Sequence, residues 1–235
     1  MKIAILLPYK EDYSSKYAGA VSIHVANLYN CSKFKNYISI YGNTNNSKYL
    51  SSNFKNIKIK TNVLTSSNKK YLNKFISIQK VSEPNIIEIH NRPNYVEKIV
   101  SKLKSKIILY FHNNPLTIAG SKTLKERIYL LNNSEFIFFN SNWTKNQFFK
   151  NLNENDYVKK FGVCYQSTIK TKVNLNKKKN IITFVGKLNS AKGYDIFGQT
   201  IVKILDKYNN WKSVVIGDEP REKHFFKHKN LKILS

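Results

Sequence analysis

Short apolar runs alternate with longer amphipathic stretches along most of this chain. Residues 3–8 are continuously apolar and end in proline, which predicts a fully buried strand. Further strands are predicted at 37–41, 57–60, 86–90, 106–111 and 136–139, and helices at 20–29, 69–80, 95–103, 123–131 and 144–150. In the first helix, Val21, Val25 and Leu28 are spaced to share one face. This alternation is typical of βαβ units around a parallel sheet and predicts an α/β fold.

A second series of the same kind follows a pause in the pattern. Residues 161–165 could be a last strand of the first series, and 167–179 are polar and lysine-rich, as linkers are. A strand at 181–185, a helix at 191–207 and strands at 213–216 and 231–234 then follow. We therefore predict one domain over 1–170, a linker over 171–180 and a partial second domain over 181–235. About 55 residues are at the lower limit for an independent core, so we expect the sequence to be a fragment.

The composition indicates a folded protein with anionic partners. The 235 residues are 41% hydrophobic, which is enough for a sizeable core, and no apolar run approaches the roughly 18 residues of a membrane span, so we expect a cytoplasmic protein. Forty Lys+Arg against fourteen Asp+Glu give a net charge of +26, which favours anionic partners. Only three of these basic residues are arginines, and the lysines are scattered, unlike a nucleic-acid-binding tail. Cys31 and Cys164 form no C-x-x-C motif.

Polar residues follow the predicted strands of the first domain, where an open parallel sheet binds its ligands. Gly19 precedes the first helix and could let the backbone approach a phosphate, although a simple turn explains it equally. The residue after the strand at 106–111 is a histidine, suited to proton exchange or to hydrogen bonding with a hydroxyl, or to a structural role. The candidate site residues at these strand ends are His90, Asn91, His112, Asn113, Asn140 and Ser141. Ser141 also fits the N-cap of the next helix.

The second domain carries two cations around a predicted helix start. Lys187 and Lys192 lie five residues apart in the segment that runs from Gly186 to Gly193, between a buried strand and a helix. Both ammonium groups and the backbone N–H groups there could bind a diphosphate, whereas the alternative is a solvated lysine-rich turn. Gly217 and Asp218 begin a tight turn, Gly-Asp-Glu-Pro, after the next strand.

Taken together, these motifs resemble family 4 glycosyltransferases of the GT-B fold. F-V-G-K-L-N-S-A-K-G-Y-D-I-F followed by V-V-I-G-D-E-P is similar to their nucleotide-sugar half, which usually shows V-G-R-L-x-x-x-K-G and then G-x-G-x or G-D-G-P. In the first half, Y-A-G-A-V-S-I-H-V resembles their G-G-V-x-x-H-V loop and helix, I-I-E-I-H-N a strand that ends in a polar pair, and F-H-N their acceptor-side histidine.

The resemblance implies a sugar transferase built from two Rossmann-like domains, the second one incomplete here. Lys187, Lys192, Gly193 and Gly19 would bind the donor diphosphate, and His112 would act at the acceptor or at the transferred sugar. Acceptor or cleft-lining roles fall to His90, Asn91, Asn113, Asn140, Ser141, Gly217 and Asp218.

The same resemblance implies the reaction and its partners. It implies transfer with retention from a nucleoside diphosphate sugar to a glycan or lipid-linked acceptor, in envelope polysaccharide or lipopolysaccharide synthesis. The leaving diphosphate would be stabilised without a metal or other cofactor. The basic surface could contact an anionic membrane.

Three departures from the family pattern change this expectation. Ala20 replaces the second glycine of the family loop, and Lys187 replaces an arginine and so loses a bidentate fork. The E-x7-E segment of the family would fall beyond Ser235, so we expect little or no transferase activity from these 235 residues.

Two other classes of function compete with an enzyme. The same fold could be a binding module for a lipid-linked or sugar-phosphate ligand, or a nucleic-acid-binding protein driven by charge, although we expect no specific nucleic acid partner. His224 and His228 are spaced i, i+4, but no third ligand lies nearby in the sequence, and we expect no metal site.

Overall fold

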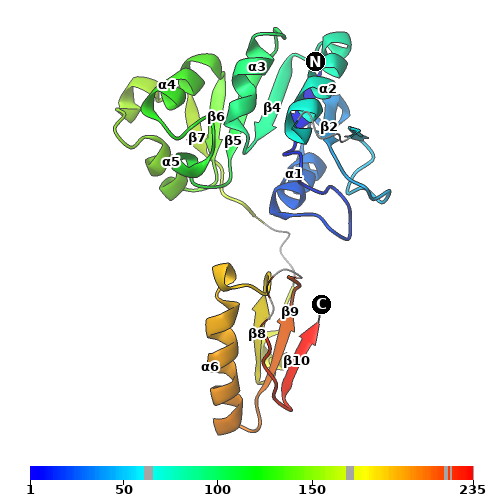
Figure 1. The fold of residues 1–235 in the computed structure, drawn as a ribbon, viewed down its shortest axis with the longest axis vertical. Helices are drawn as coiled ribbons and strands as arrows, with labels where there is room; N and C mark the ends of the chain where they lie inside the picture. The colour runs from blue at the N-terminus through cyan, green and yellow to red at the C-terminus, as the bar shows by residue number, and fades with distance from the viewer. Residues whose placement is uncertain (61–65, 168–171, 220–221, 223, 235) are drawn as a thin grey trace. The chain divides into compact units, whose positions relative to one another are not determined.

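The computed structural model describes residues 1–60, 66–167, 172–219, 222 and 224–234. Residue 171 of the predicted linker and Pro220 of the predicted turn lie outside these residues. The chain divides into two compact units, unit 1 (Met1–Ile169) and unit 2 (Lys170–Ser235). Each unit contains its own parallel sheet (Figure 1). The α/β fold class predicted from the sequence is confirmed.

Unit 1 is built on a seven-stranded sheet in the order β3-β2-β1-β4-β5-β6-β7. All neighbouring strands of this sheet pair in parallel. The strands are β1 (Ile3–Leu6), β2 (Ile38–Gly42), β3 (Phe54–Asn56), β4 (Ile86–His90), β5 (Lys106–Phe111), β6 (Phe136–Phe139) and β7 (Phe161–Val163). The order reverses between β1 and β4, which makes the carboxyl ends of these strands the expected ligand-binding edge of a Rossmann-like sheet.

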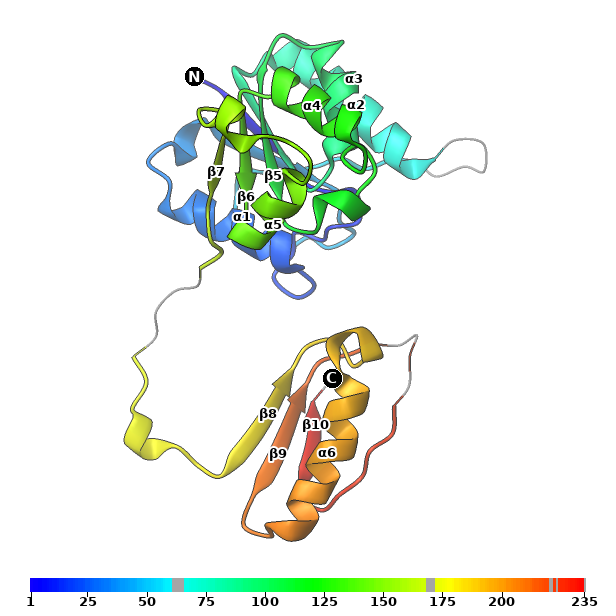
Figure 2. The ribbon, with the colours of Figure 1, turned by 90° about the vertical axis from the view of Figure 1, so that its left-hand side faces the viewer.

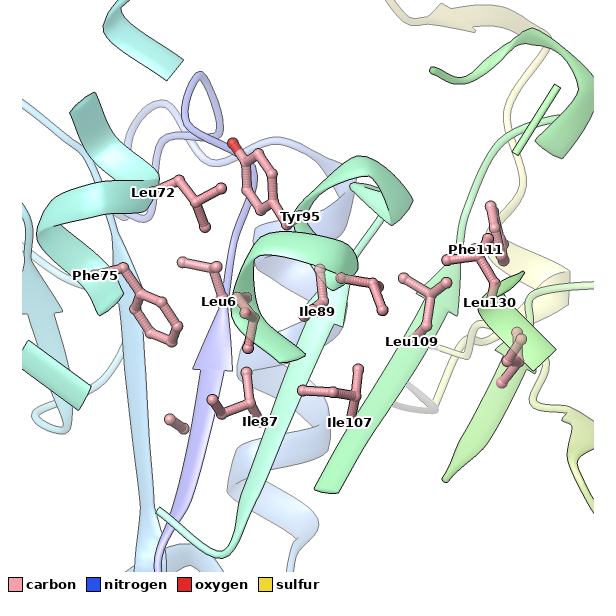
Figure 3. Packing of buried hydrophobic residues seen from close by; sticks show 14 of the residues in the cluster. Leu6, Leu72, Phe75, Ile87, Ile89, Tyr95, Ile107, Leu109, Phe111 and Leu130 are labelled. Carbon is pink, nitrogen blue, oxygen red and sulfur yellow. The ribbon is translucent and has the colours of Figure 1, made fainter. Parts of the chain in front are cut away.

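Helices cover both faces of this sheet. They are α1 (Ala20–Cys31), α2 (Ser67–Ser82), α3 (Val96–Val100), α4 (Leu124–Asn133) and α5 (Asn142–Phe148). The main core lies between the sheet and α2 to α5 and includes Leu6, Phe75, Ile89 and Leu109, all fully buried (Figure 3). A second apolar cluster, with Ile5, Val25 and Ile40, joins α1 to the opposite face.

Unit 2 has a three-stranded parallel sheet in the order β10-β9-β8. Its strands are β8 (Ile181–Val185), β9 (Lys212–Ile216) and β10 (Leu231–Leu234), and α6 (Tyr194–Lys207) runs along one face (Figure 2). Tyr194, Ile201 and Leu205 of α6 are buried, and the ring of Phe184 on β8 lies 5.3 Å from that of Tyr194.

Three predicted elements are wrong in position. The strand predicted at 57–60 is replaced by β3 at Phe54–Asn56, because Phe54 and not the alternating Lys-Ile run pairs with β2. The helix predicted at 95–103 is the short α3, preceded by a 3₁₀ turn at Pro93–Tyr95. The helix predicted at 191–207 begins three residues later, because Gly193 takes a left-handed conformation (φ 72°) that interrupts it.

The apolar face predicted for the first helix is also partly wrong. Val25 is fully buried, but Leu28 is exposed. The buried positions of α1 are instead Ser22, His24, Val25 and Ala26, so the helix turns a polar part of its surface toward the sheet. That orientation places His24 beside the strand ends described below.

Candidate functional site

Three histidines meet at the carboxyl edge of the unit 1 sheet, at the reversal of strand order. His24 comes from α1, His90 ends β4, and His112 follows β5 directly. The centroid of the His24 ring lies 5.3 Å from that of His112, and the His90 and His112 rings are stacked at 5.2 Å. Tyr110 of β5 stacks on both His90 and His112. The structure therefore brings together the two histidines predicted from the sequence and adds a third.

A chain of hydrogen bonds runs through the two predicted histidines. His90 Nε2 lies 2.7 Å from the Glu88 carboxylate, and His90 Nδ1 lies 2.9 Å from His112 Nε2. At the far end, the amide Nε2 of Gln166 lies 2.9 Å from His112 Nδ1. His90 is fully buried, and the side chain of Glu88 is 20% exposed. We call Glu88, His90, His112 and Gln166 the imidazole chain.

The predicted asparagines hold the backbone around His112. Asn91 adopts a left-handed conformation (φ 54°), and its Oδ1 accepts hydrogen bonds from the backbone N–H groups of His112 and Asn113. Asn140 donates from Nδ2 to the carbonyl of His112 at 2.8 Å. Strand ends β4, β5 and β6 are thereby tied together at one loop.

Ser141 serves as a helix cap. Its Oγ accepts a hydrogen bond from the backbone N–H of Thr144 at 3.1 Å, as expected for the N-cap of α5. The capping alternative that the sequence left open is therefore the geometry observed.

Burial disfavours protonation of two of the three histidines, His112 and His24. Desolvation, reinforced by His90 and His24, lowers the pKa of His112 to about 2. Burial also lowers the pKa of His24, and its Nε2 has no hydrogen-bond partner among the described residues. Burial raises the pKa of Tyr110, whose hydroxyl donates to the carbonyl of Cys164. At neutral pH, His112 is thus a neutral hydrogen-bonding group and not a cation.

In unit 2, the loop after β8 forms a capped turn before α6. The Oδ1 of Asn189 accepts from the backbone N–H of Lys192 at 3.1 Å, and residues 190–192 make one 3₁₀ turn. Lys187 and Lys192 are both exposed; Lys187 precedes this turn and Lys192 is its last residue. Their predicted role, and that of Gly193, in binding a diphosphate stays a prediction.

The loop after β9 lies against the loop after β8. A Cβ added to Gly217 would lie 1.8 Å from the carbonyl oxygen of Gly186, so only glycine fits at this position. Gly186 also donates its N–H to the carbonyl of Ile216 at 3.0 Å. Asp218, the next residue, is exposed. The Gly-Asp pair predicted as cleft-lining therefore begins with a glycine that the packing of unit 2 requires.

Carboxylates of the chain already contact the turn before α6. Glu222 accepts hydrogen bonds from the backbone N–H and the hydroxyl of Ser190, at 2.8 and 2.5 Å. The Nε2 of His224 lies 2.7 Å from the same oxygen. These hydrogen bonds from Ser190 and His224 lower the pKa of Glu222 to about 2. Sequence reasoning did not find this contact, because it joins two loops across 32 residues.

The start of α1 shows a comparable arrangement. Glu11 Oε1 accepts from the backbone N–H of Ser22 at 3.0 Å, within the first turn of the helix. A Cβ at Gly19 would lie 2.4 Å from that oxygen. The space beside Gly19 is occupied in this structure by the carboxylate of Glu11. Binding of a donor phosphate at Gly19 stays a prediction.

The histidines outside the cluster do not share a helix. Residues 224–230 form no helix, so His224 and His228 are not on one helix face as their spacing suggested. Among the described residues no group of three or more His, Cys, Asp or Glu side chains could hold a metal ion. No helix in the part of the chain that the structure describes is both long and apolar enough to cross a membrane.

Sequence reasoning missed Glu88, His24 and Gln166. Glu88 and His90 are two residues apart on one strand and so point to the same face, a signal that was present in I-I-E-I-H. His24 stands in the V-S-I-H-V segment that carried the family resemblance. Gln166 carries no signal, because its contact joins residues 54 positions apart.

Comparison with known proteins supports the resemblance drawn from the sequence. Residues 166–234 match the family model described as glycosyl transferases group 1. No curated protein matches the chain. The family match covers less than a third of the sequence and lies mainly in unit 2.

Several solved structures share the fold. HepE of Anabaena, in complex with UDP-glucose, is similar with a TM-score of 0.63 and 9% identity, over 100% of this chain and 69% of that chain. A glycosyltransferase from Rickettsia africae is similar with a TM-score of 0.60 and 15% identity, over 94% and 62%. S. aureus MnaA with UDP is similar with a TM-score of 0.58 and 12% identity, over 99% and 68%. These likenesses establish a GT-B-type architecture.

Proposed function

We propose that this chain is part of a glycosyltransferase that binds a nucleoside diphosphate sugar through unit 2 and acts on a glycan or lipid-linked acceptor. The observation that carries the proposal is the match of residues 166–234 to glycosyl transferases group 1. That segment includes the strand, the capped turn and the helix start around which Lys187 and Lys192 lie.

The geometry of unit 2 supports an anion-binding role for this turn. The turn precedes α6, whose first backbone N–H groups and positive dipole end favour a negative ligand. The Ser190 N–H and hydroxyl already bind a carboxylate, so the turn presents donors suited to an anionic oxygen. Lys187 and Lys192 are exposed in the same loop, and two ammonium groups suit a diphosphate.

The proposed reaction is transfer with retention of configuration. The leaving diphosphate is stabilised by Lys187, Lys192 and backbone N–H groups, which supply positive charge where negative charge develops. His112 contacts the acceptor or the transferred sugar, with His90, Asn91, Asn113 and Asn140 arranged around it. A net charge of +26 would favour contact with an anionic membrane in envelope polysaccharide synthesis.

Binding of nucleoside diphosphates tests this proposal without requiring turnover. We expect UDP, GDP or another nucleoside diphosphate to raise the thermal unfolding midpoint and to bind by calorimetry. Lys192→Ala and Lys187→Ala should each weaken binding about fivefold, since each removes one charge-assisted contact.

Lys203, in the helix that follows the turn, provides a matched control. Lys203→Ala removes the same charge from the exposed middle of α6, and we expect it to change binding by less than about twofold. Equal weakening by Lys192→Ala and Lys203→Ala would show non-specific attraction to a basic surface. Failure of every nucleoside diphosphate to bind would contradict the proposal.

A further inference from the structure

We infer that Glu88 and His90 are positioning residues that hold His112 as a single neutral tautomer, with its proton on Nε2 and with Nδ1 as a hydrogen-bond acceptor. The inference rests on the proposed function only in assigning His112 to the ligand site. The tautomer itself follows from the polarity of the imidazole chain.

The carboxylate of Glu88 determines which way the hydrogen bonds of the imidazole chain point. An ionised carboxylate only accepts hydrogen bonds, so the 2.7 Å contact of Glu88 with His90 requires the proton on His90 Nε2. In a neutral His90, Nδ1 is then an acceptor. The 2.9 Å bond between the two rings must therefore be donated by His112 Nε2–H.

The amide end agrees with this direction but does not impose it, because the exposed amide of Gln166 can exchange the positions of its oxygen and nitrogen. In the orientation that the amide has here, the Nε2 of Gln166 donates to His112 Nδ1 in their 2.9 Å contact. A neutral His112 then carries its proton on Nε2 and donates toward His90. The reverse polarity would set two donors against each other at this end and two acceptors at Glu88.

The surroundings leave the His112 ring little freedom to rearrange. The backbone on either side is bonded to Asn91 and Asn140, the ring is stacked on Tyr110 at 4.5 Å, and His24 approaches it edge-on. Burial disfavours protonation of the His112 ring. A neutral, oriented imidazole is the state that the packing holds.

This tautomer determines which ligand group His112 can recognise. The Nδ1 lone pair accepts a hydrogen bond, so it suits a hydroxyl and not a phosphate oxygen, which also accepts. Gln166 is exposed, and a ligand hydroxyl could replace its amide at Nδ1. Under the proposed function, His112 Nδ1 would recognise a sugar hydroxyl, while the donor diphosphate is bound in unit 2.

Nitrogen-15 NMR of the histidine rings tests the inference on the ligand-free chain. We expect His90 and His112 each to show the Nε2–H tautomer at neutral pH. Glu88→Leu removes the acceptor that anchors the chain, so the Nδ1 and Nε2 signals of His112 should move toward each other as both tautomers become populated. Proton occupancy of Nδ1 in unaltered His112 would overturn the inference, as would Glu88→Leu leaving the His112 signals unchanged.

Gln166→Ala separates the two ends of the chain. Gln166 is exposed, so its removal should leave the fold intact, and His112 should keep its proton on Nε2 because Glu88 and His90 still set it. A switch of His112 to Nδ1–H in this variant would show that Gln166, and not Glu88, determines the tautomer, and would overturn the inference. This variant and the unaltered chain decide the question even if Glu88→Leu fails to fold.

The result is independent of nucleotide binding. The ring signals are measured without any nucleotide, so failure of nucleoside diphosphates to bind would leave the tautomer result standing. Conversely, a wrong tautomer would leave the anion site of unit 2 untouched.

Discussion

The two sheets present opposite kinds of surface at their carboxyl edges. In unit 1, His90 and His112 are buried and bonded to each other, and His90 is also bonded to the carboxylate of Glu88. In unit 2 the lysines lie exposed around a turn whose backbone N–H group at Ser190 is bonded to a carboxylate. The first arrangement orients hydrogen bonds and the protons of the histidine rings, whereas the second supplies positive charge.

Both units nevertheless set a carboxylate of their own at a helix start. Glu11 bonds the N–H of Ser22 in α1, and Glu222 bonds Ser190 before α6. Glu11 is held against Gly19, at a position where any Cβ would collide with it. The side chain of Glu222 is 41% exposed, so a ligand can reach and replace it.

The largest effect is expected from Gly217→Ala in unit 2. The new Cβ would overlap the carbonyl oxygen of Gly186, and the variant should lower the free energy of unfolding of unit 2 by about 3 kcal/mol. Trp211 reports on this unit once Trp143→Phe has removed the tryptophan of unit 1, so urea unfolding followed by fluorescence measures it.

Gly193→Ala is the matched control for that measurement. Nothing lies within 4 Å of its added Cβ, so only the left-handed backbone (φ 72°) disfavours alanine, at about 1 kcal/mol. Equal losses for the two variants would mean that the two loops of unit 2 are not in contact at Gly217.

The sequence predicted the sheets much better than the contacts between loops. Strands β4, β5 and β8 match their predicted bounds, because short apolar runs differ sharply from their flanks. The prediction that β8 is a buried strand is wrong, since its residues alternate between exposed and half-buried. Strand β3 was missed, because the Ile-Lys alternation at 57–60 imitates a strand while Phe54 makes the pairing. The delayed start of α6 depends on the backbone conformation of a single glycine.

The candidate site was predictable where it follows strand ends and not elsewhere. His90, His112 and Asn140 come directly after or at the end of adjacent strands, so topology alone brings them together. Glu222 and Gln166 reach their partners from loops 32 and 54 residues away, and no local pattern encodes such contacts.

The next largest effect is a difference in acid sensitivity between the units. The pKa of His112 is lowered to about 2 in the folded state, against about 6.5 unfolded, so the unfolded chain binds more protons between these values. Unit 1 therefore loses stability as pH falls below about 6.5, by about 1 kcal/mol from this histidine between pH 7 and 5.5. His24, whose pKa is also lowered, acts in the same direction.

Unit 2 should lose stability only at a lower pH than unit 1. The pKa of Glu222 is lowered from 4.5 to about 2, so its contribution is present above about pH 4.5 and is lost only as pH falls further. Trp143 reports on unit 1 when Trp211 is replaced by phenylalanine. His112→Gln should reduce the loss in unit 1 between pH 7 and 5.5, and an unchanged loss in that variant would show that His112 is not buried in neutral form.

The smallest effect expected is a gain in ligand binding from Glu222→Gln. If the turn before α6 binds a diphosphate, Glu222 competes with it for the N–H and hydroxyl of Ser190 and also repels it. Glutamine keeps an oxygen for Ser190 but removes the charge, and screening by solvent limits the benefit to roughly two- to fivefold tighter binding of a nucleoside diphosphate. Asp206→Asn removes one carboxylate from the last turn of α6, with a side chain 66% exposed, and should leave affinity unchanged within about twofold. Calorimetry at low and moderate salt measures both variants. Equal gains in affinity from the two variants would show that only the net charge of the protein matters. A gain from Glu222→Gln alone would show that the anion binds at the start of α6 and not at the buried edge of unit 1.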